Sequence, residues 1–116
     1  MADSEFVTEF VFVYSTLPDK VSAAQIADTL VSAGLAACVN IHGPMTSVYK
    51  WEGKLETALE FALFIKTRRA LADQVIAAAR KLHPYTLPCF LILPIEGGNA
   101  DYLGWARAQT ERPQIA

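Results

Sequence analysis

The segment from residue 55 to residue 67 constrains the fold more than any other part of the chain. Large apolar side chains occupy every second position from Leu59 to Ile65, while the positions between them hold a mixture of small, charged and aromatic residues. Successive side chains of a β-strand point to opposite faces, so the pattern predicts one long strand with an apolar face and a mixed face. The fold therefore contains a sheet with at least one buried face.

Similar patterns define the elements on either side of this strand. Ser22 and Gln25 form a capping box that begins a helix. Gly43-Pro44 interrupts a strand, and His83-Pro84 ends a helix because the residue before proline avoids helical backbone. The predicted elements are a strand at 10–16, a helix from 22 to 34, a strand at 35–41 that resumes at 47–51, the strand at 55–67, a helix at 70–82, a strand at 87–95 and a last helix capped by Asn99.

The order of these elements is βαββαβ followed by a C-terminal helix. This order predicts an α+β, ferredoxin-like fold, in which two helices cover one face of a four-stranded antiparallel sheet. A chain of 116 residues fits a single domain, which we expect to span residues 1–116 with loose termini at 1–8 and 111–116.

Charge and hydropathy argue against nucleic acid and membrane partners. Ten basic and twelve acidic residues give a net charge of −2 without a basic stripe for a phosphate backbone. The acidic start at 1–5 lacks the features of a secretory signal, and apolar runs such as 61–65 are too short to span a bilayer. We therefore expect no nucleic acid partner, no membrane insertion and a cytoplasmic location.

The predicted strands are apolar on both faces, which indicates self-association. Hydrophobic residues make up 53% of the chain and the mean hydropathy is +0.25. Residues 10–14 and 91–95 place large apolar side chains on both sides of their strands, so the sheet face without helices also needs a cover. Other copies of the chain are the favoured cover, and the alternative is that the last helix folds across part of this face.

Motifs for catalysis are weak, and we expect no enzymatic activity. Gly97-Gly98 lacks the residues of a phosphate-binding loop, and no serine has the spacing of a nucleophile elbow. Cys38 with His42 or His83 would form a thiolate nucleophile only in an exposed and electropositive setting, which nothing in the sequence indicates.

Metal binding is the better supported chemistry. Cys38, His42, His83 and Cys89 are ligand types that suit copper or zinc. In the ferredoxin-like strand order, however, Cys38 and Cys89 lie at opposite sheet edges, about 14 Å apart, so one chain joins them neither by a metal nor by a disulfide. Two reduced, buried thiols without a metal are the alternative interpretation.

A family resemblance appears when several segments are taken together. Residues 35–40, 47–54, 65–67, 83–85 and 101–105 resemble the CutA family of divalent-cation tolerance proteins from the first strand to the last helix. The resemblance implies a homotrimer with an architecture related to PII signalling proteins, together with a role in tolerance of divalent cations such as copper. A protein partner of the assembly stays unknown.

The same resemblance implies two groups of site residues. Copper-binding members take ligands from a cysteine that ends the first strand and from a histidine pair before Pro-Tyr, and these positions hold Ser15, Leu82 and His83 here. Only His83 is retained, so the expected metal ligands are His83, Cys89 and Cys38. The resemblance also implies a possible ligand cleft between subunits, with Trp51, Glu60, Lys66 and Tyr85. Alternatively, Trp51 and Tyr85 are aromatic anchors of the interface, and the trimer is a structural or small-molecule-sensing assembly without a physiological metal.

Overall fold

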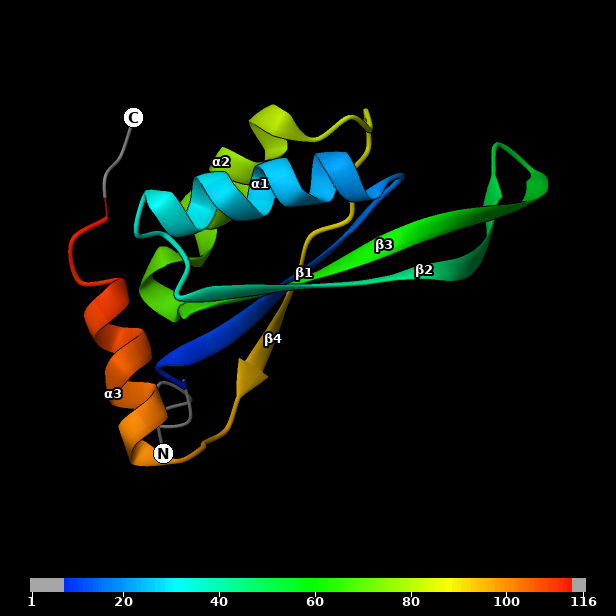
Figure 1. Cartoon of the computed structure of the whole chain (residues 1–116). Helices are drawn as coiled ribbons and strands as arrows, with labels where there is room; N and C mark the ends of the chain where they lie inside the picture. Colours follow the sequence, from blue (N-terminus) through cyan, green and yellow to red (C-terminus); the bar gives the residue numbers. More distant parts are fainter. Residues whose placement is uncertain (1–7, 114–116) are drawn as a thin grey trace.

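The computed structural model describes residues 8–113 and contains a four-stranded sheet with three α-helices (Figure 1). The chain order is β1 (Phe10–Leu17), α1 (Lys20–Ser32), β2 (Cys38–Trp51), β3 (Lys54–Arg68), the short 3-10 turn η2 (Arg69–Leu71), α2 (Ala72–Leu82), β4 (Leu91–Ile95) and α3 (Ala100–Gln109). Of the termini expected to be loose, residues 1–7 and 114–116 lie outside the described residues.

The sheet has the strand order β2-β3-β1-β4, and all its neighbouring strands are antiparallel. Helices α1 and α2 lie together on one face of it, as the ferredoxin-like order predicts (Figure 1). The α+β fold is therefore confirmed. Strands β2 and β4 are the two edges, so the prediction that Cys38 and Cys89 lie at opposite sides of the sheet is also correct.

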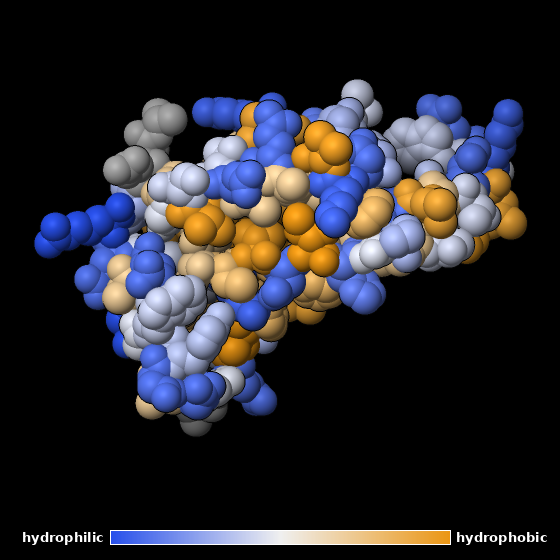
Figure 2. Space-filling view, viewed as in Figure 1, coloured by the Kyte–Doolittle hydropathy of each residue, from blue (hydrophilic) through white to orange (hydrophobic). Residues whose placement is uncertain are grey.

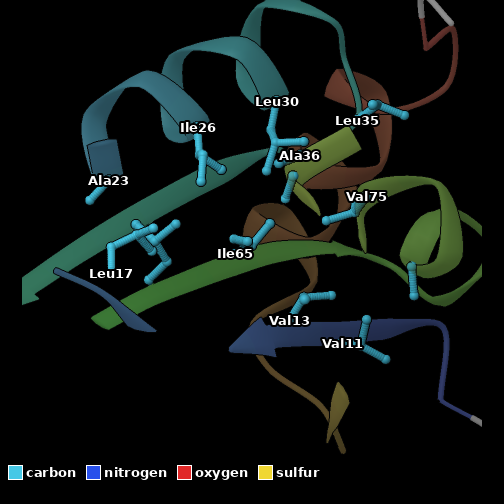
Figure 3. Close-up of a cluster of buried hydrophobic side chains, with 13 residues drawn as sticks. Val11, Val13, Leu17, Ala23, Ile26, Leu30, Leu35, Ala36, Ile65 and Val75 are labelled. Atoms are coloured by element: carbon cyan, nitrogen blue, oxygen red, sulfur yellow. The ribbon is translucent and has the colours of Figure 1, made fainter. Parts of the chain in front are cut away.

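The main core fills the space between the sheet and the two helices. Val13 of β1, Ile65 of β3 and Ile26 of α1 are completely buried there, and Figure 3 shows the helix side chains pointing toward the strands. These residues follow a period of two along the strands and of three to four along the helix, which is why the sequence pattern located them. The buried residues of this core are all aliphatic.

Helix α1 begins two residues earlier than its predicted capping box. Asp19, and not Ser22, is the N-cap, because its carboxylate accepts a hydrogen bond of 2.8 Å from the backbone N–H of Ser22. The Ser22 hydroxyl instead donates to the Asp19 carbonyl oxygen. Both residues are good N-caps, and Asp19 has the extended backbone, with φ −152° and ψ 166°, that a capping residue adopts.

Strand β2 is continuous where an interruption was expected. The Gly43-Pro44 step is accommodated as a bulge between His42 and Met45, after which pairing with β3 resumes. Gly43 has φ +155°, and a β-carbon there would lie 2.7 Å from the Phe61 ring and 2.9 Å from the Glu60 carbonyl oxygen. Glycine thus lets the two strands approach closely at the point where β1 ends.

Beyond this bulge, β2 and β3 continue as a two-stranded arm of residues 45–60, which projects past the rest of the sheet (Figure 1). Glu52 and Gly53, with φ of 50° and 81°, turn the chain at its tip. Positive φ at both central positions is typical of a type I′ hairpin turn. Strand β4 is shorter than predicted, because residues 87–90 form no strand; Leu87 and Cys89 of this segment line the groove described below.

Helix α3 covers one end of the sheet face opposite α1 and α2. Phe10, Ala37 and Ala106 form a second small core there, with Ile95 and Leu103 packed against it. The alternative prediction, that the last helix folds across part of this face, is therefore correct, but the cover is incomplete. Leu91 and Leu93 of β4 remain exposed, by 55% and 44%. Within residues 8–113, no helix is long and apolar enough to cross a membrane.

Candidate functional site

A groove of about 590 Å³ lies where β1 ends and the arm begins. The arm supplies one wall, and the segment between α2 and β4 supplies the other. Its lining residues are Thr16, Ser47, Val48, Tyr49, Trp51, Glu60, Pro84, Tyr85, Thr86, Leu87 and Cys89. The groove therefore depends on segments that are distant in the sequence and that meet only in the folded sheet.

Glu60 is the charged residue at the base of this groove. It is only 8% exposed, although it lies one residue beyond Phe61, the last position of β3 that pairs with β1. The Tyr85 hydroxyl donates a hydrogen bond of 2.8 Å to Glu60 Oε2. Burial and this carboxylate raise the pKa of Tyr85 well above its usual range, so the phenol stays a donor at any physiological pH. The pair ties the loop after α2 to the base of the arm.

His83 holds the start of the same loop. Its Nδ1 accepts a hydrogen bond of 3.2 Å from the backbone N–H of Tyr85, and its Nε2 lies 2.9 Å from the Thr16 carbonyl oxygen. Because a carbonyl oxygen only accepts, Nε2 carries the proton and the ring is neutral. Burial lowers the pKa of His83, against the opposing effects of Thr16 and Glu60. The hydroxyl of Ser15 lies 3.3 Å from the same Nε2.

These contacts affect the expected metal ligands. Both ring nitrogens of His83 are engaged, so a metal ion would bind there only after the ring leaves one of its partners. Cys89 lines the groove, and burial together with Glu60 raises the pKa of its thiol, which disfavours the thiolate that a metal needs. Cys38 lies on the opposite edge strand. Within the described part of the chain, no three His, Cys, Asp or Glu side chains are grouped to hold a metal ion.

The four residues expected in a ligand cleft do not all meet. Trp51, Glu60 and Tyr85 line the groove, but Lys66 does not. Six residues of extended strand separate Lys66 from Glu60, about 20 Å at roughly 3.3 Å per residue. The Lys66 ammonium instead lies 5.6 Å from the centroid of the Tyr102 ring on α3. Within one chain the length of β3 therefore separates Lys66 from the groove, and a cleft between subunits that includes Lys66 stays a prediction.

Sequence reasoning missed other parts of the site. Tyr49 and Thr16 line the groove, and Ser15 contacts the His83 ring. The family resemblance pointed to Ser15 only as a replaced ligand position, but parity also marks it, since Ser15 interrupts the apolar series of Val11, Val13 and Leu17 on the buried face of β1. A fully buried serine in such a series indicates a polar partner, which proves to be His83.

The fold and this groove define a small α+β protein with a ferredoxin-like sheet, an arm and a binding cleft. The family profile described as "CutA1 divalent ion tolerance protein" matches residues 11–109, so the chain belongs to this family. A rice relative, "Protein CutA 1, chloroplastic", is 43% identical over 100 residues, which cover 86% of this chain and 56% of the relative. The chain thus spans little more than half the length of that relative.

Archaeal relatives are closer to this chain in length. The Archaeoglobus fulgidus "Divalent-cation tolerance protein CutA" is 44% identical over 94 residues, which cover 81% of this chain and 91% of the relative. A solved structure described as the periplasmic divalent cation tolerance protein CutA from Archaeoglobus fulgidus superimposes with a TM-score of 0.85 at 40% identity, covering 87% of this chain and 98% of that one. The expectation of a cytoplasmic location was wrong, since relatives are described as chloroplastic and periplasmic.

Proposed function

We propose that this chain acts in divalent-cation tolerance as a homotrimer that binds copper or a related divalent metal ion. The family supports the role in tolerance. Trimer formation is supported above all by apolar surface that a single chain leaves uncovered. Side chains exposed on the arm and on β4 include Val48, Leu55, Leu59, Leu91 and Leu93, and Figure 2 shows hydrophobic residues among polar ones along the projecting arm.

The arm gives this proposal a physical basis. A two-stranded ribbon is marginally stable by itself in water, and residues 45–60 have no third strand beside them in one chain. Both outer strands of the sheet, β2 and β4, also present unpaired edges. Packing of neighbouring copies against the arm and these edges would bury the exposed leucines and satisfy the open backbone groups. Closed symmetry is the usual arrangement for such self-association.

Light scattering after gel filtration at micromolar concentration tests the assembly. The expected mass is three times the chain mass of 12.7 kDa. A species of 12.7 kDa at this concentration would contradict the proposal. Absence of catalytic turnover is a separate prediction, which steady conversion of any substrate would contradict.

For the metal ion, we propose Cys89 as a ligand, with His83 or groups from a neighbouring subunit completing the set. Cys38 begins edge strand β2 and Cys89 lies two residues before edge strand β4, so a neighbouring copy that covers these edges would lie near both thiols. Two ligands from one chain bind weakly, so binding should be coupled to assembly and should stabilise it.

Copper titration by calorimetry tests this site in the wild type and in Cys89→Ser, His83→Ala and Cys38→Ser. We expect Cys89→Ser to weaken binding by at least about tenfold, because loss of a thiolate ligand is costly for a soft metal. Unchanged affinity in all three variants would remove support for metal binding by these residues. In that case the second candidate, a small-molecule-sensing trimer without a physiological metal, is favoured by the groove beside Glu60.

A further inference from the structure

We infer that the groove beside Glu60 binds a small organic ammonium ion. This inference rests on the second candidate function and does not depend on copper binding, and it requires that the groove stays open when neighbouring copies pack against the arm. It rests on three features of the groove: a buried carboxylate without a cation, aromatic walls and a negative surrounding charge.

The carboxylate of Glu60 lacks a cationic partner. Within residues 8–113, the ion pair that the structure contains is that of Arg107 with Glu9, at the far end of the sheet. In the same part of the chain, the Tyr85 hydroxyl is the one donor to Glu60. Burial of a carboxylate is costly unless a cation or several donors compensate it. A cation that enters the groove would therefore supply the partner that the Glu60 carboxylate lacks.

Among the residues that line the groove, Glu60 carries the one charged side chain. Glu60 and Asp19 both act to raise the pKa of Tyr85, and Glu60 also raises the pKa values of Cys89 and Tyr14. No cationic residue acts on any of these three groups in the described part of the chain. A groove with this field attracts cations and repels anions.

The walls distinguish an organic cation from a metal ion. Tyr49, Trp51 and Tyr85 line the groove, and aromatic faces attract ammonium groups with particular preference for alkylated ones. A hard metal ion needs six or more oxygen ligands and a soft one needs several thiolates or imidazoles, neither of which the described residues group here. The groove, of about 590 Å³, has the size of ordinary small-molecule sites.

A matched pair of probes tests the charge requirement on the unmodified protein. Choline carries a trimethylammonium group, whereas 3,3-dimethylbutan-1-ol has the same shape without the charge. We expect calorimetry to show that choline binds at least about tenfold more tightly than the alcohol, because only the cation gains from the carboxylate and the aromatic faces. Equal affinities would overturn the inference. So would the absence of choline binding at millimolar concentration, as expected if a neighbouring copy's lysine or arginine fills the groove.

Variants then locate the site. Glu60→Gln keeps the shape of the side chain and should weaken choline binding by at least about tenfold, since it removes a charge-assisted contact. Glu56→Gln is the matched control, because Glu56 lies on the same face of β3 but is exposed and outside the groove. Equal effects of the two substitutions would overturn the inference. Trp51→Leu should weaken choline binding severalfold and leave the alcohol unaffected. Copper titration of Glu60→Gln keeps this test separate from the proposed metal site.

Discussion

The two ends of strand β3 differ in how completely one chain buries their apolar side chains. On the helix side, Leu63 and Ile65 of β3 are completely buried by α1 and α2. Along the same strand in the arm, Leu55 and Leu59 are 75% and 66% exposed. One strand thus carries a finished core at one end and an unfinished surface at the other. The alternation of apolar residues along a strand therefore does not tell which of them one chain buries and which it leaves exposed.

The largest expected effect is in the finished core. Leu63→Ala should lower the free energy of unfolding by about 2 to 5 kcal/mol, because it removes buried methyl groups and leaves a cavity. Leu59→Ala, four residues earlier on the same face of β3, should cost less than about 1 kcal/mol in urea unfolding of the dilute chain. Equal losses in the two variants would contradict the contrast between the two ends of the strand.

The next effect is on assembly. Leu93→Glu places a charge among the exposed apolar residues of β4, so the trimer should dissociate toward a mass of 12.7 kDa at micromolar concentration. Val21→Glu is the matched control, because Val21 is exposed on α1, on the helix side of the sheet. A trimer that survives Leu93→Glu, or one that Val21→Glu disrupts equally, would mean that the uncovered side is not the interface.

A smaller effect comes from His83, where the helix side meets the groove. Its folded-state pKa is lowered from an unfolded value near 6.5, so its stabilising contribution is fully present above about pH 6.5 and is lost as pH falls through the folded value. The slope cannot exceed about 1.4 kcal/mol per pH unit, since one proton is involved. Protonation would also place a second donor against the backbone N–H of Tyr85.

Chemical unfolding between pH 5 and pH 8 measures this dependence. His83→Asn should flatten it, because the amide oxygen of asparagine can accept the Tyr85 hydrogen bond without titrating. The same slope in wild type and His83→Asn would assign the dependence to other groups.

The smallest expected effect concerns Cys89. Burial makes the larger contribution to its raised pKa and Glu60 the smaller one, so Glu60→Gln should speed alkylation of this thiol at pH 8 by only a factor of about 2 to 5. Peptide mass analysis after a timed iodoacetamide pulse distinguishes Cys89 from Cys38. Glu56→Gln should leave the rate at Cys89 unchanged, and an equal acceleration there would show that Glu60 does not control the thiol.

Prediction from sequence succeeded where local periodicity decided the structure. The alternation in β3 and the helical spacing in α2 located both elements, and the element order led to the strand order. It was less accurate where two local solutions compete, as for the choice between Asp19 and Ser22 at the start of α1. Both residues have the chemistry of a cap, so the side-chain types alone do not decide between them.

The site was predicted only in part, because its geometry depends on a loop path. Trp51, Glu60 and Tyr85 were expected together, and they do meet. Lys66 lies near α3 in the same chain, so its place in a cleft between subunits stays a prediction. The contact of the His83 ring with the Thr16 carbonyl oxygen was not predictable, since it joins the end of α2 to a backbone atom of β1. Sequence spacing carries no information about which carbonyl a distant imidazole reaches.

The strand order also has a consequence for how the chain folds as it is made. The local β2–β3 hairpin can pair as soon as residues 38–68 have left the ribosome, because its strands are joined by a two-residue turn. Central strand β1 lies beside residues 91–95, so one of its edges stays open until nearly the whole chain has been synthesised. During that interval the apolar hairpin and the open edge of β1 are both accessible to other nascent copies. Chains translated side by side on one message would therefore meet while the surfaces assigned to the proposed self-association are still exposed.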